Sequence, residues 1–179
     1  MTWKNLSTEK ILETPYFSIE KNKVQKSDGK IVDPFYVIRR PNVVTIAPLT
    51  ENNEVILIKQ YRHGINLEAY EIPAGHVEKD ENPLDAAHRE LLEETGYNSK
   101  ELIMINESYS SVGILDNKNF FYIAQNCKKT HEQNLDESEE IEVEIFKIKE
   151  AMQMIKDGKI KDMASITGLL LLENYLSSR

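Results

Sequence analysis

The hydrophobic pattern of the chain combines short apolar segments with longer helical repeats and predicts a mixed α/β protein. Residues 141–147 alternate apolar and charged side chains, as expected for a half-exposed strand. The apolar segments 42–48 and 54–60 are joined by the polar turn 50–53, which indicates a buried hairpin. Similar patterns predict further strands at 17–20, 35–39, 102–105 and 120–124.

The clearest helix is predicted over residues 83–95. Asn82 precedes it as an N-cap, Pro83 occupies the first helical position, and Gly96 follows as a C-cap. Apolar residues recur within it at i, i+3 and i+7 and are expected to face the core: Leu84, Ala87 and Leu91. The carboxylates of this helix are expected on the opposite face.

Two further helices are predicted near the C-terminus, at 149–157 and 165–175. The second contains four consecutive leucines at 169–172. Such a run is buried on most sides, so it belongs either to the core or to a subunit contact.

The first 41 residues are predicted to form a small antiparallel β appendage to a main domain of residues 42–179. Ser27, Asp28 and Gly29 form the expected hairpin turn. An isolated hairpin is only marginally stable in water. The appendage must therefore pack on its own domain or on a second subunit.

Composition narrows the function classes. The 179 residues carry a net charge of −8, which argues against binding to nucleic acid or to anionic membranes. No apolar run is long enough to span a bilayer and the N-terminus does not resemble a signal peptide, so we expect a cytoplasmic protein. Cys127 is the single cysteine, which excludes an intrachain disulfide.

Carboxylates crowd the stretch 75–97, where Glu90, Glu93 and Glu94 fall on one helix. Like charges four residues apart weaken a helix by about 0.2–0.5 kcal/mol, so the cluster indicates a missing cation. Oxygen ligands suit Mg²⁺, which substrate phosphates usually complete, and Arg89 can hold Glu93 through an i,i+4 ion pair. The alternative is a solvated acidic helix face, which is common in a protein with 30 acidic residues.

The spacing of this stretch resembles the signature of the Nudix hydrolases, G-x5-E-x7-R-E-U-x-E-E-x-G-U, in which U is aliphatic. Tyr97 departs from the final aliphatic position. The resemblance implies an α/β/α sandwich with a mixed sheet and hydrolysis of a pyrophosphate bond with Mg²⁺, or alternatively Mn²⁺. Gly75 is expected to supply backbone freedom where a strand turns into the following loop. The matching positions are Gly75, Glu81, Arg89, Glu90, Leu91, Glu93, Glu94 and Gly96.

Residues outside the signature resemble the ADP-ribose pyrophosphatase and nucleoside diphosphate sugar hydrolase branch of this family. The resemblance implies ADP-ribose or GDP-mannose as substrate, and a homodimer whose N-terminal segment is exchanged and helps to grip the nucleotide. The segments that carry it are Arg39-Arg40, Gln60-Tyr61-Arg62, Glu71 to Gly75, Ala86-Ala87 and residues 155–169.

The same resemblance implies a role for each site residue. The metal ligands would be the Ala74 carbonyl, Glu90 and Glu94, with Glu93 sharing or adjusting the metal ions. The substrate-binding residues would be Arg39, Arg40, Arg62, Glu71, Tyr16, Phe17 and Val112, with Tyr16 or Phe17 stacking on the base. The candidate catalytic residues would be Glu93, Asp116 and Arg89.

The loop after the signature departs from this branch. Where relatives carry Ser-Pro-Gly, this chain has Ser111-Val112-Gly113, which weakens the expectation of a strict preference for ADP-ribose. Asp116 and Asn117 stand where many members place a catalytic glutamate, so the base is either Asp116 or Glu93. Two alternatives stay open: another Nudix substrate, such as a diadenosine polyphosphate or an oxidised nucleotide, and a non-catalytic domain that senses nucleotides.

Overall fold

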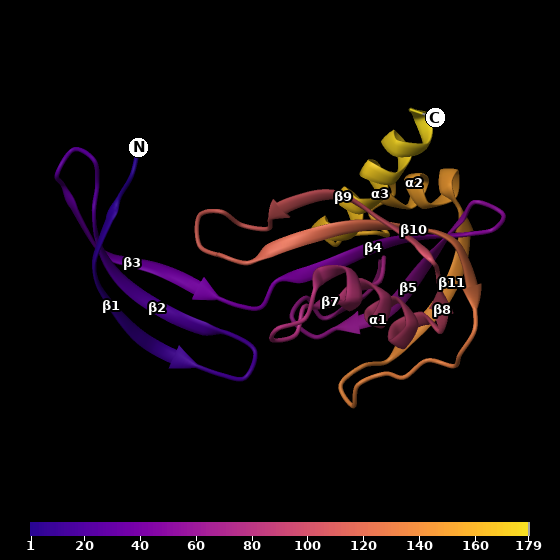
Figure 1. Cartoon of the computed structure of the whole chain (residues 1–179), viewed down its shortest axis with the longest axis horizontal. Helices are drawn as coiled ribbons and strands as arrows, with labels where there is room; N and C mark the ends of the chain where they lie inside the picture. Colours follow the sequence, from indigo (N-terminus) through magenta and orange to yellow (C-terminus); the bar gives the residue numbers. More distant parts are fainter. Residues whose placement is uncertain (179) are drawn as a thin grey trace. The chain divides into compact units, whose positions relative to one another are not determined.

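The computed structural model describes residues 1–178 and divides into two compact units (Figure 1). The smaller unit contains residues 1–42 and 108–118, and the larger unit contains residues 43–107 and those from 119 onwards. Separate functional roles for residues 1–41 and 42–179 stay a prediction. No helix within the described residues is long and apolar enough to cross a membrane.

The smaller unit contains an antiparallel sheet in the order β1-β2-β3. Its strands are β1 (Lys4–Glu13), β2 (Ser18–Gln25) and β3 (Ile31–Arg39). The side chains of β1 are exposed throughout, so no buried face marked this strand in the sequence. The loop within residues 108–118 contacts this sheet, because the Ile38 N–H donates to the Ile114 carbonyl over 2.8 Å.

A mixed sheet forms the centre of the larger unit, with the order β11-β5-β4-β10-β8. β4 and β10 run parallel, whereas β5 is antiparallel to β4, β6 and β11. The strands are β4 (Val43–Thr50), β5 (Glu54–Arg62), β6 (Leu67–Glu71), β7 (Ala74–His76), β8 (Tyr97–Asn98), β9 (Glu101–Tyr109), β10 (Lys118–Lys129) and β11 (Ile141–Lys147).

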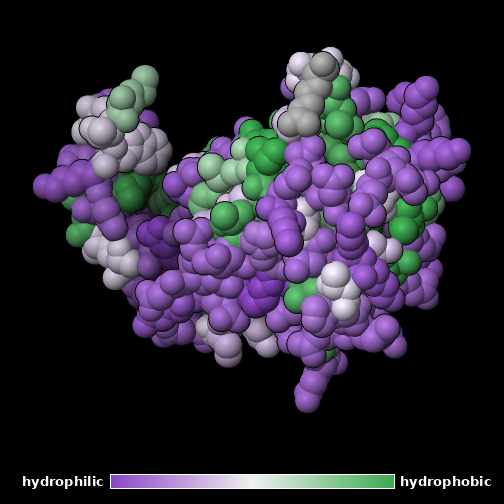
Figure 2. Space-filling model, turned by 45° about the vertical axis from the view of Figure 1, so that its right-hand side comes forward, coloured by the Kyte–Doolittle hydropathy of each residue, from purple (hydrophilic) through white to green (hydrophobic). Residues whose placement is uncertain are grey.

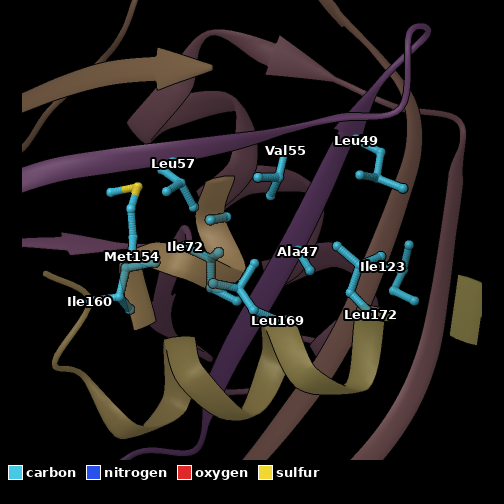
Figure 3. Close-up of a cluster of buried hydrophobic side chains, with 11 residues drawn as sticks. Ala47, Leu49, Val55, Leu57, Ile72, Ile123, Met154, Ile160, Leu169 and Leu172 are labelled. Atoms are coloured by element: carbon cyan, nitrogen blue, oxygen red, sulfur yellow. The ribbon is translucent and has the colours of Figure 1, made fainter. Parts of the chain in front are cut away.

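Helices cover both faces of this sheet, which confirms the predicted fold class. They are α1 (Pro83–Thr95), α2 (Ile148–Lys156) and α3 (Met163–Ser177). Alternate residues of a strand point to opposite faces: Ile56 packs in the cluster under α1, whereas Val55 and Leu57 pack in the cluster under α2 and α3. Figure 3 shows the second cluster, with Leu169 and Leu172 of α3 directed toward the sheet.

The structure corrects two expectations about helix faces. Leu84 is 38% exposed and does not face the core, because helical side chains lean toward the N-terminus and Leu84 lies in the first turn of α1. Leu169 and Leu172 are buried as expected, whereas Leu170 is 49% exposed. The leucine run is therefore not buried on most sides.

Most of the surface in view is hydrophilic, with smaller groups of hydrophobic atoms on both units (Figure 2). Several large apolar side chains of β1 are among the exposed ones, namely Leu6, Ile11 and Leu12. An exposed apolar strand of this kind is a candidate contact surface.

Candidate active site

Helix α1 presents the carboxylates of the site and begins and ends where the sequence predicted. The Asn82 side chain accepts from the Leu84 N–H over 2.9 Å, and Gly96 adopts a left-handed conformation with φ of 73°. Its N–H bonds to the Leu92 carbonyl over 2.8 Å. These two caps set where the helix begins and where it ends.

Glu94 is buried, with 3% of its surface exposed. Its carboxylate accepts the Ala74 N–H over 3.0 Å. Burial raises the pKa of Glu94 well above the ordinary value of 4.5, and repulsion from Glu90 raises it further. The expectation that Glu94 lies opposite the apolar stripe is therefore wrong: this carboxylate is held in the protein interior with little to stabilise its charge.

Glu90 lies against Gly75, which belongs to strand β7. A Cβ atom added at Gly75 would lie 2.0 Å from the Glu90 Cδ atom. Gly75 lies inside strand β7 and does not have a positive φ, so the expected turn at this glycine is wrong, and the close approach of Glu90 is what requires glycine here. Burial raises the pKa of Glu90, while the hydrogen bond from Arg89 acts in the opposite direction.

Arg89 neutralises the remaining carboxylates. Its Nε and Nη2 donate to the two oxygens of Glu81, each over 2.9 Å. Its Nη1 donates to Glu90 over 2.8 Å and to Glu93 over 3.1 Å, and Nη2 also donates to the His76 carbonyl over 2.9 Å. The predicted i,i+4 pair with Glu93 is present, and Arg89 lowers the pKa of Glu81 through its hydrogen bonds.

Arg62 and Glu71 form a second charged pair in the larger unit. Nε and Nη2 of Arg62 donate to the two Glu71 oxygens over 2.8 and 2.5 Å. The Glu71 side chain is 6% exposed and that of Arg62 is 46% exposed. Arg62 therefore keeps an accessible face while Glu71 fixes its orientation. The pKa of Arg62 is raised, chiefly by the hydrogen bond to Glu71 and also by the charges of Glu94 and Asp162.

The chemistry of these residues fits a divalent cation. Among residues 1–178, no three acidic, histidine or cysteine groups are already arranged around a metal position. However, Glu94 is buried with a single backbone donor, and Glu90 approaches it closely enough to raise its pKa. A cation between two such carboxylates would remove their repulsion, and carboxylate oxygens are the ligands that Mg²⁺ takes. The role of the Ala74 carbonyl stays a prediction.

Four of the predicted substrate residues come together in the smaller unit. Tyr16, Phe17, Arg39 and Arg40 line an open cavity of about 250 Å³. Tyr16 is 70% exposed and Phe17 is 38% exposed, so neither aromatic side chain is committed to a core. A surface with two guanidinium groups and two exposed rings suits a nucleotide, although the roles of these residues stay predictions.

Asp116 is held by Arg39 within the smaller unit. The Arg39 Nη1 donates to Asp116 over 3.0 Å, and Nε donates to Glu20 over 3.0 Å. Val112, from the same loop as Asp116, is 83% exposed and contacts little. The structure thus places Asp116 in an ion pair, and its role as a base stays a prediction.

Two residues of these networks were missed in the sequence. Glu20 orients Arg39, and no local pattern pointed to it because the two residues meet across β2 and β3. Ser165 is buried at the start of α3, where its hydroxyl accepts from the Ile72 N–H. Asp162, a preferred N-cap residue, would have indicated the start of this helix, which begins two residues earlier than predicted.

Comparison with known proteins identifies the family of this chain. A family model described as the NUDIX domain matches residues 39–166, and the chain belongs to the Nudix family of hydrolases. A protein named ADP-ribose pyrophosphatase from Bacillus subtilis (strain 168) is 29% identical over 95% of this chain and 92% of its own length.

Other relatives carry different names. A methanol dehydrogenase activator from Bacillus methanolicus is 30% identical over 95% of this chain and 92% of its own length. A GDP-mannose pyrophosphatase from Escherichia coli (strain K12) is 30% identical over 97% of this chain and 94% of its own length. A solved structure described as an ADP compounds hydrolase has a TM-score of 0.86 over 99% of this chain and 96% of that chain, and its 21% identity supports the fold alone.

Proposed function

We propose that this protein hydrolyses the pyrophosphate bond of nucleoside diphosphate sugars with Mg²⁺, and that ADP-ribose and GDP-mannose are its first candidate substrates. One observation carries the proposal: the buried Glu94 carboxylate has a single backbone donor and lies beside the Glu90 carboxylate, in a chain that matches named pyrophosphatases along almost its whole length. The products would be a nucleoside monophosphate and a sugar phosphate.

The larger unit supplies groups for binding a pyrophosphate. Arg62 offers an oriented guanidinium, which suits the geometry of phosphate oxygens. Glu90 and Glu94 would hold Mg²⁺, which when bound would neutralise the phosphate oxygens and stabilise the leaving phosphate. Arg89 holds Glu93 and Glu90 in fixed positions. Mn²⁺ is an alternative cation with the same ligand preference.

A group that accepts a proton from the attacking water completes the proposal. Asp116 and Glu93 are the two candidates. For Asp116 to accept a proton, its ion pair with Arg39 must open, since Nη1 of Arg39 occupies one of its oxygens. Glu93 keeps its carboxylate 36% exposed while bonded to Arg89.

We also propose a homodimer that involves the N-terminal sheet. The support is β1, which carries exposed apolar side chains along a strand with little of its own core to cover them. The partner molecules would be nucleotide sugars and a second copy of the chain. Nucleic acid and membrane are not expected partners at a net charge of −8, and a cytoplasmic location stays a prediction.

A substrate panel tests the proposed reaction. The purified protein is incubated with Mg²⁺ and, separately, with ADP-ribose, GDP-mannose, diadenosine polyphosphates, oxidised nucleotides and nucleoside triphosphates, and the products are identified by mass. We expect AMP with ribose phosphate, or GMP with mannose phosphate, as the fastest products. Cleavage of nucleoside triphosphates alone would overturn the proposal.

A regulatory role is the second candidate, because one relative is named as an activator of another enzyme. The test is binding of ADP-ribose by calorimetry beside the turnover assay. Tight binding without turnover at any Mg²⁺ concentration would favour the regulatory role over hydrolysis.

A further inference from the structure

The first turn of α3 contacts the segment that joins β6 to β7. Asp162 caps the helix, and its Oδ2 accepts from the Ser165 N–H over 2.7 Å and from the Ser165 hydroxyl over 2.8 Å. The same hydroxyl accepts from the Ile72 N–H over 3.1 Å, and Ser165 is 1% exposed. One buried hydroxyl therefore uses its donor on the helix cap and an acceptor site on the β6–β7 segment.

The joining segment, residues 71–74, is held at successive backbone groups. The partners are Ser165 Oγ for the Ile72 N–H, the Ile46 N–H for the Pro73 carbonyl at 2.8 Å, and Glu94 Oε2 for the Ala74 N–H at 3.0 Å. Of these partners, only Ser165 and Glu94 act through side chains. Each of these two hydrogen bonds can therefore be removed by a single substitution.

Gly168 allows the helix to approach this segment. A Cβ atom added there would lie 2.5 Å from the Ile72 Cδ1 atom and 3.7 Å from the Thr45 Cγ2 atom. Ser165 and Gly168 lie three residues apart on α3 and both lie against Ile72, whereas Asp162 is the N-cap of the helix. Two residues of the C-terminal stretch 155–169 therefore lie against Ile72.

Both ends of the joining segment carry parts of the candidate active site. Glu71 at one end holds Arg62 through two hydrogen bonds, and Ala74 at the other end donates to Glu94. A shift of Ile72 would move both ends, because only one peptide unit separates Ile72 from Glu71 and two separate it from Ala74. The separation of the guanidinium and the buried carboxylate depends on how this segment is held.

We propose that the Ser165 hydroxyl is a positioning group that sets the placement of Arg62 relative to Glu94 by fixing the Ile72 backbone. The proposal rests on the proposed function for its kinetic consequence and on the hydrogen-bond geometry for its structural one. Ser165 is 1% exposed and acts through the backbone that joins Glu71 to Ala74.

Substitution of Ser165 tests the kinetic consequence. In Ser165→Ala the Ile72 N–H loses its acceptor, so we expect the KM for ADP-ribose and the half-saturating Mg²⁺ concentration both to rise about threefold or more. Ser165→Thr keeps the hydroxyl and is expected to restore both values toward wild type. A merely structural role would lower the active fraction, and hence kcat, with both concentrations unchanged; that result would overturn the proposal.

Leu172→Val provides the matched control. Leu172 is a fully buried residue of the same helix, and it lies toward Ile123 rather than Ile72 (Figure 3). Its substitution weakens the packing of α3 and is expected to leave the KM and the Mg²⁺ dependence at wild-type values. Equal changes in Ser165→Ala and Leu172→Val would overturn the proposal.

Amide hydrogen exchange supplies a readout that does not need activity. We expect the Ile72 and Ala74 amides to exchange about tenfold faster in Ser165→Ala than in wild type or in Leu172→Val. Exchange that rises in α3 but not at Ile72 and Ala74 would overturn the proposal. If wild-type protein cleaves no nucleotide sugar, the proposed function fails, and the exchange measurement still decides whether Ser165 holds the segment.

Discussion

At the scale of single residues, Glu94 joins the sequence pattern to the proposed chemistry. Ala87, Leu91 and Glu94 are spaced i, i+4 and i+7, so the carboxylate follows the apolar stripe of α1 into the interior. An ionised group at such a position is costly unless it is paired. The structure provides one backbone donor and a neighbouring carboxylate, which is an arrangement that favours cation binding over fold stability.

Glu94→Gln is predicted to stabilise the metal-free protein. The pKa of Glu94 is raised above 4.5 in the folded state, so its contribution to stability is present below pH 4.5 and is lost as the pH rises through the folded-state pKa. The stabilisation by Glu94→Gln is therefore expected to be larger near pH 8, where the buried carboxylate must ionise, than near pH 5. Urea unfolding in EDTA, near pH 5 and near pH 8, measures it.

Glu93→Gln is the control for this prediction. The Glu93 carboxylate is 36% exposed and is paired with Arg89, so its removal relieves no buried charge. We expect its urea midpoint to stay close to that of wild type at both pH values. An unchanged or lower midpoint for Glu94→Gln near pH 8 would contradict the prediction.

Gly75→Ala is predicted to separate activity from stability. The added Cβ would meet the end of the Glu90 side chain, which can turn away at little cost to the fold. Turnover is expected to fall about 100-fold, equivalent to about 2.7 kcal/mol, with the free energy of unfolding changed by less than about 1 kcal/mol. Steady-state kinetics and urea unfolding measure the two effects.

Gly96→Ala serves as the comparison for Gly75→Ala. Gly96 has φ of 73°, and a Cβ there would lie 2.2 Å from the backbone oxygen of His131. A backbone contact cannot turn away, so this variant is expected to lose about 1 kcal/mol of stability or more. Equal stability losses in the two variants would refute the distinction.

At the scale of elements, the sequence predicted those helices and strands that local residue patterns define, and missed the strand that depends on long-range pairing. Helix α1 was predicted with both ends correct because Asn82, Pro83 and Gly96 are its own end signals. Strand β1 was missed because its side chains have no buried face, and its existence depends on pairing with β2. Strand β11 has an alternating pattern and was predicted with its observed bounds.

The candidate site shows the same division. The four glutamates and Arg89 lie within one short stretch, so spacing alone revealed them. Their depth did not follow from the pattern, because burial of Glu94 depends on strand β7 lying beside α1. The contacts of Arg39 with Glu20 and Asp116 join residues far apart in the chain, so no local sequence pattern predicted them.

Asn82→Ala tests how far α1 depends on its N-cap. The side chain satisfies the Leu84 N–H, and its loss is expected to cost about 1 kcal/mol of unfolding free energy. Asn82→Asp keeps the acceptor and is expected to stay within about 0.5 kcal/mol of wild type. Urea unfolding of both variants measures the effect. Equal losses of unfolding free energy in the two variants would show that the side-chain acceptor contributes nothing.

At the scale of the whole molecule, the predicted site residues fall into two groups. Arg62, Glu71, Ala74 and the residues of α1 belong to the larger unit. The cavity residues, together with Val112 and Asp116, belong to the smaller unit. The predicted metal ligands therefore lie in the larger unit, whereas the predicted substrate-binding residues are divided between the two units.

The proposed homodimer is tested by light scattering at micromolar concentration. Two chains of 20.7 kDa give about 41 kDa, which is the mass expected for wild type. Ile11→Lys places a charge on an exposed apolar position of β1 and is expected to give a single-chain mass with an unchanged circular dichroism spectrum.

Leu170→Lys changes an equally exposed leucine of α3 and is the matched control, with the dimer mass expected. A wild-type protein that scatters as a monomer would contradict the dimer. A dimer that survives Ile11→Lys would place the contact elsewhere.

The most direct test of the central claim is AMP release from ADP-ribose as a function of Mg²⁺ concentration, in wild type and in Glu94→Gln. The account predicts equal amounts of AMP and ribose phosphate from wild type and no release in EDTA. It also predicts a rate at least about 100-fold lower in the variant than in wild type. Equal rates in the two proteins, or release that is independent of the cation, would contradict the assignment of Glu90 and Glu94 as the metal-binding half of the site.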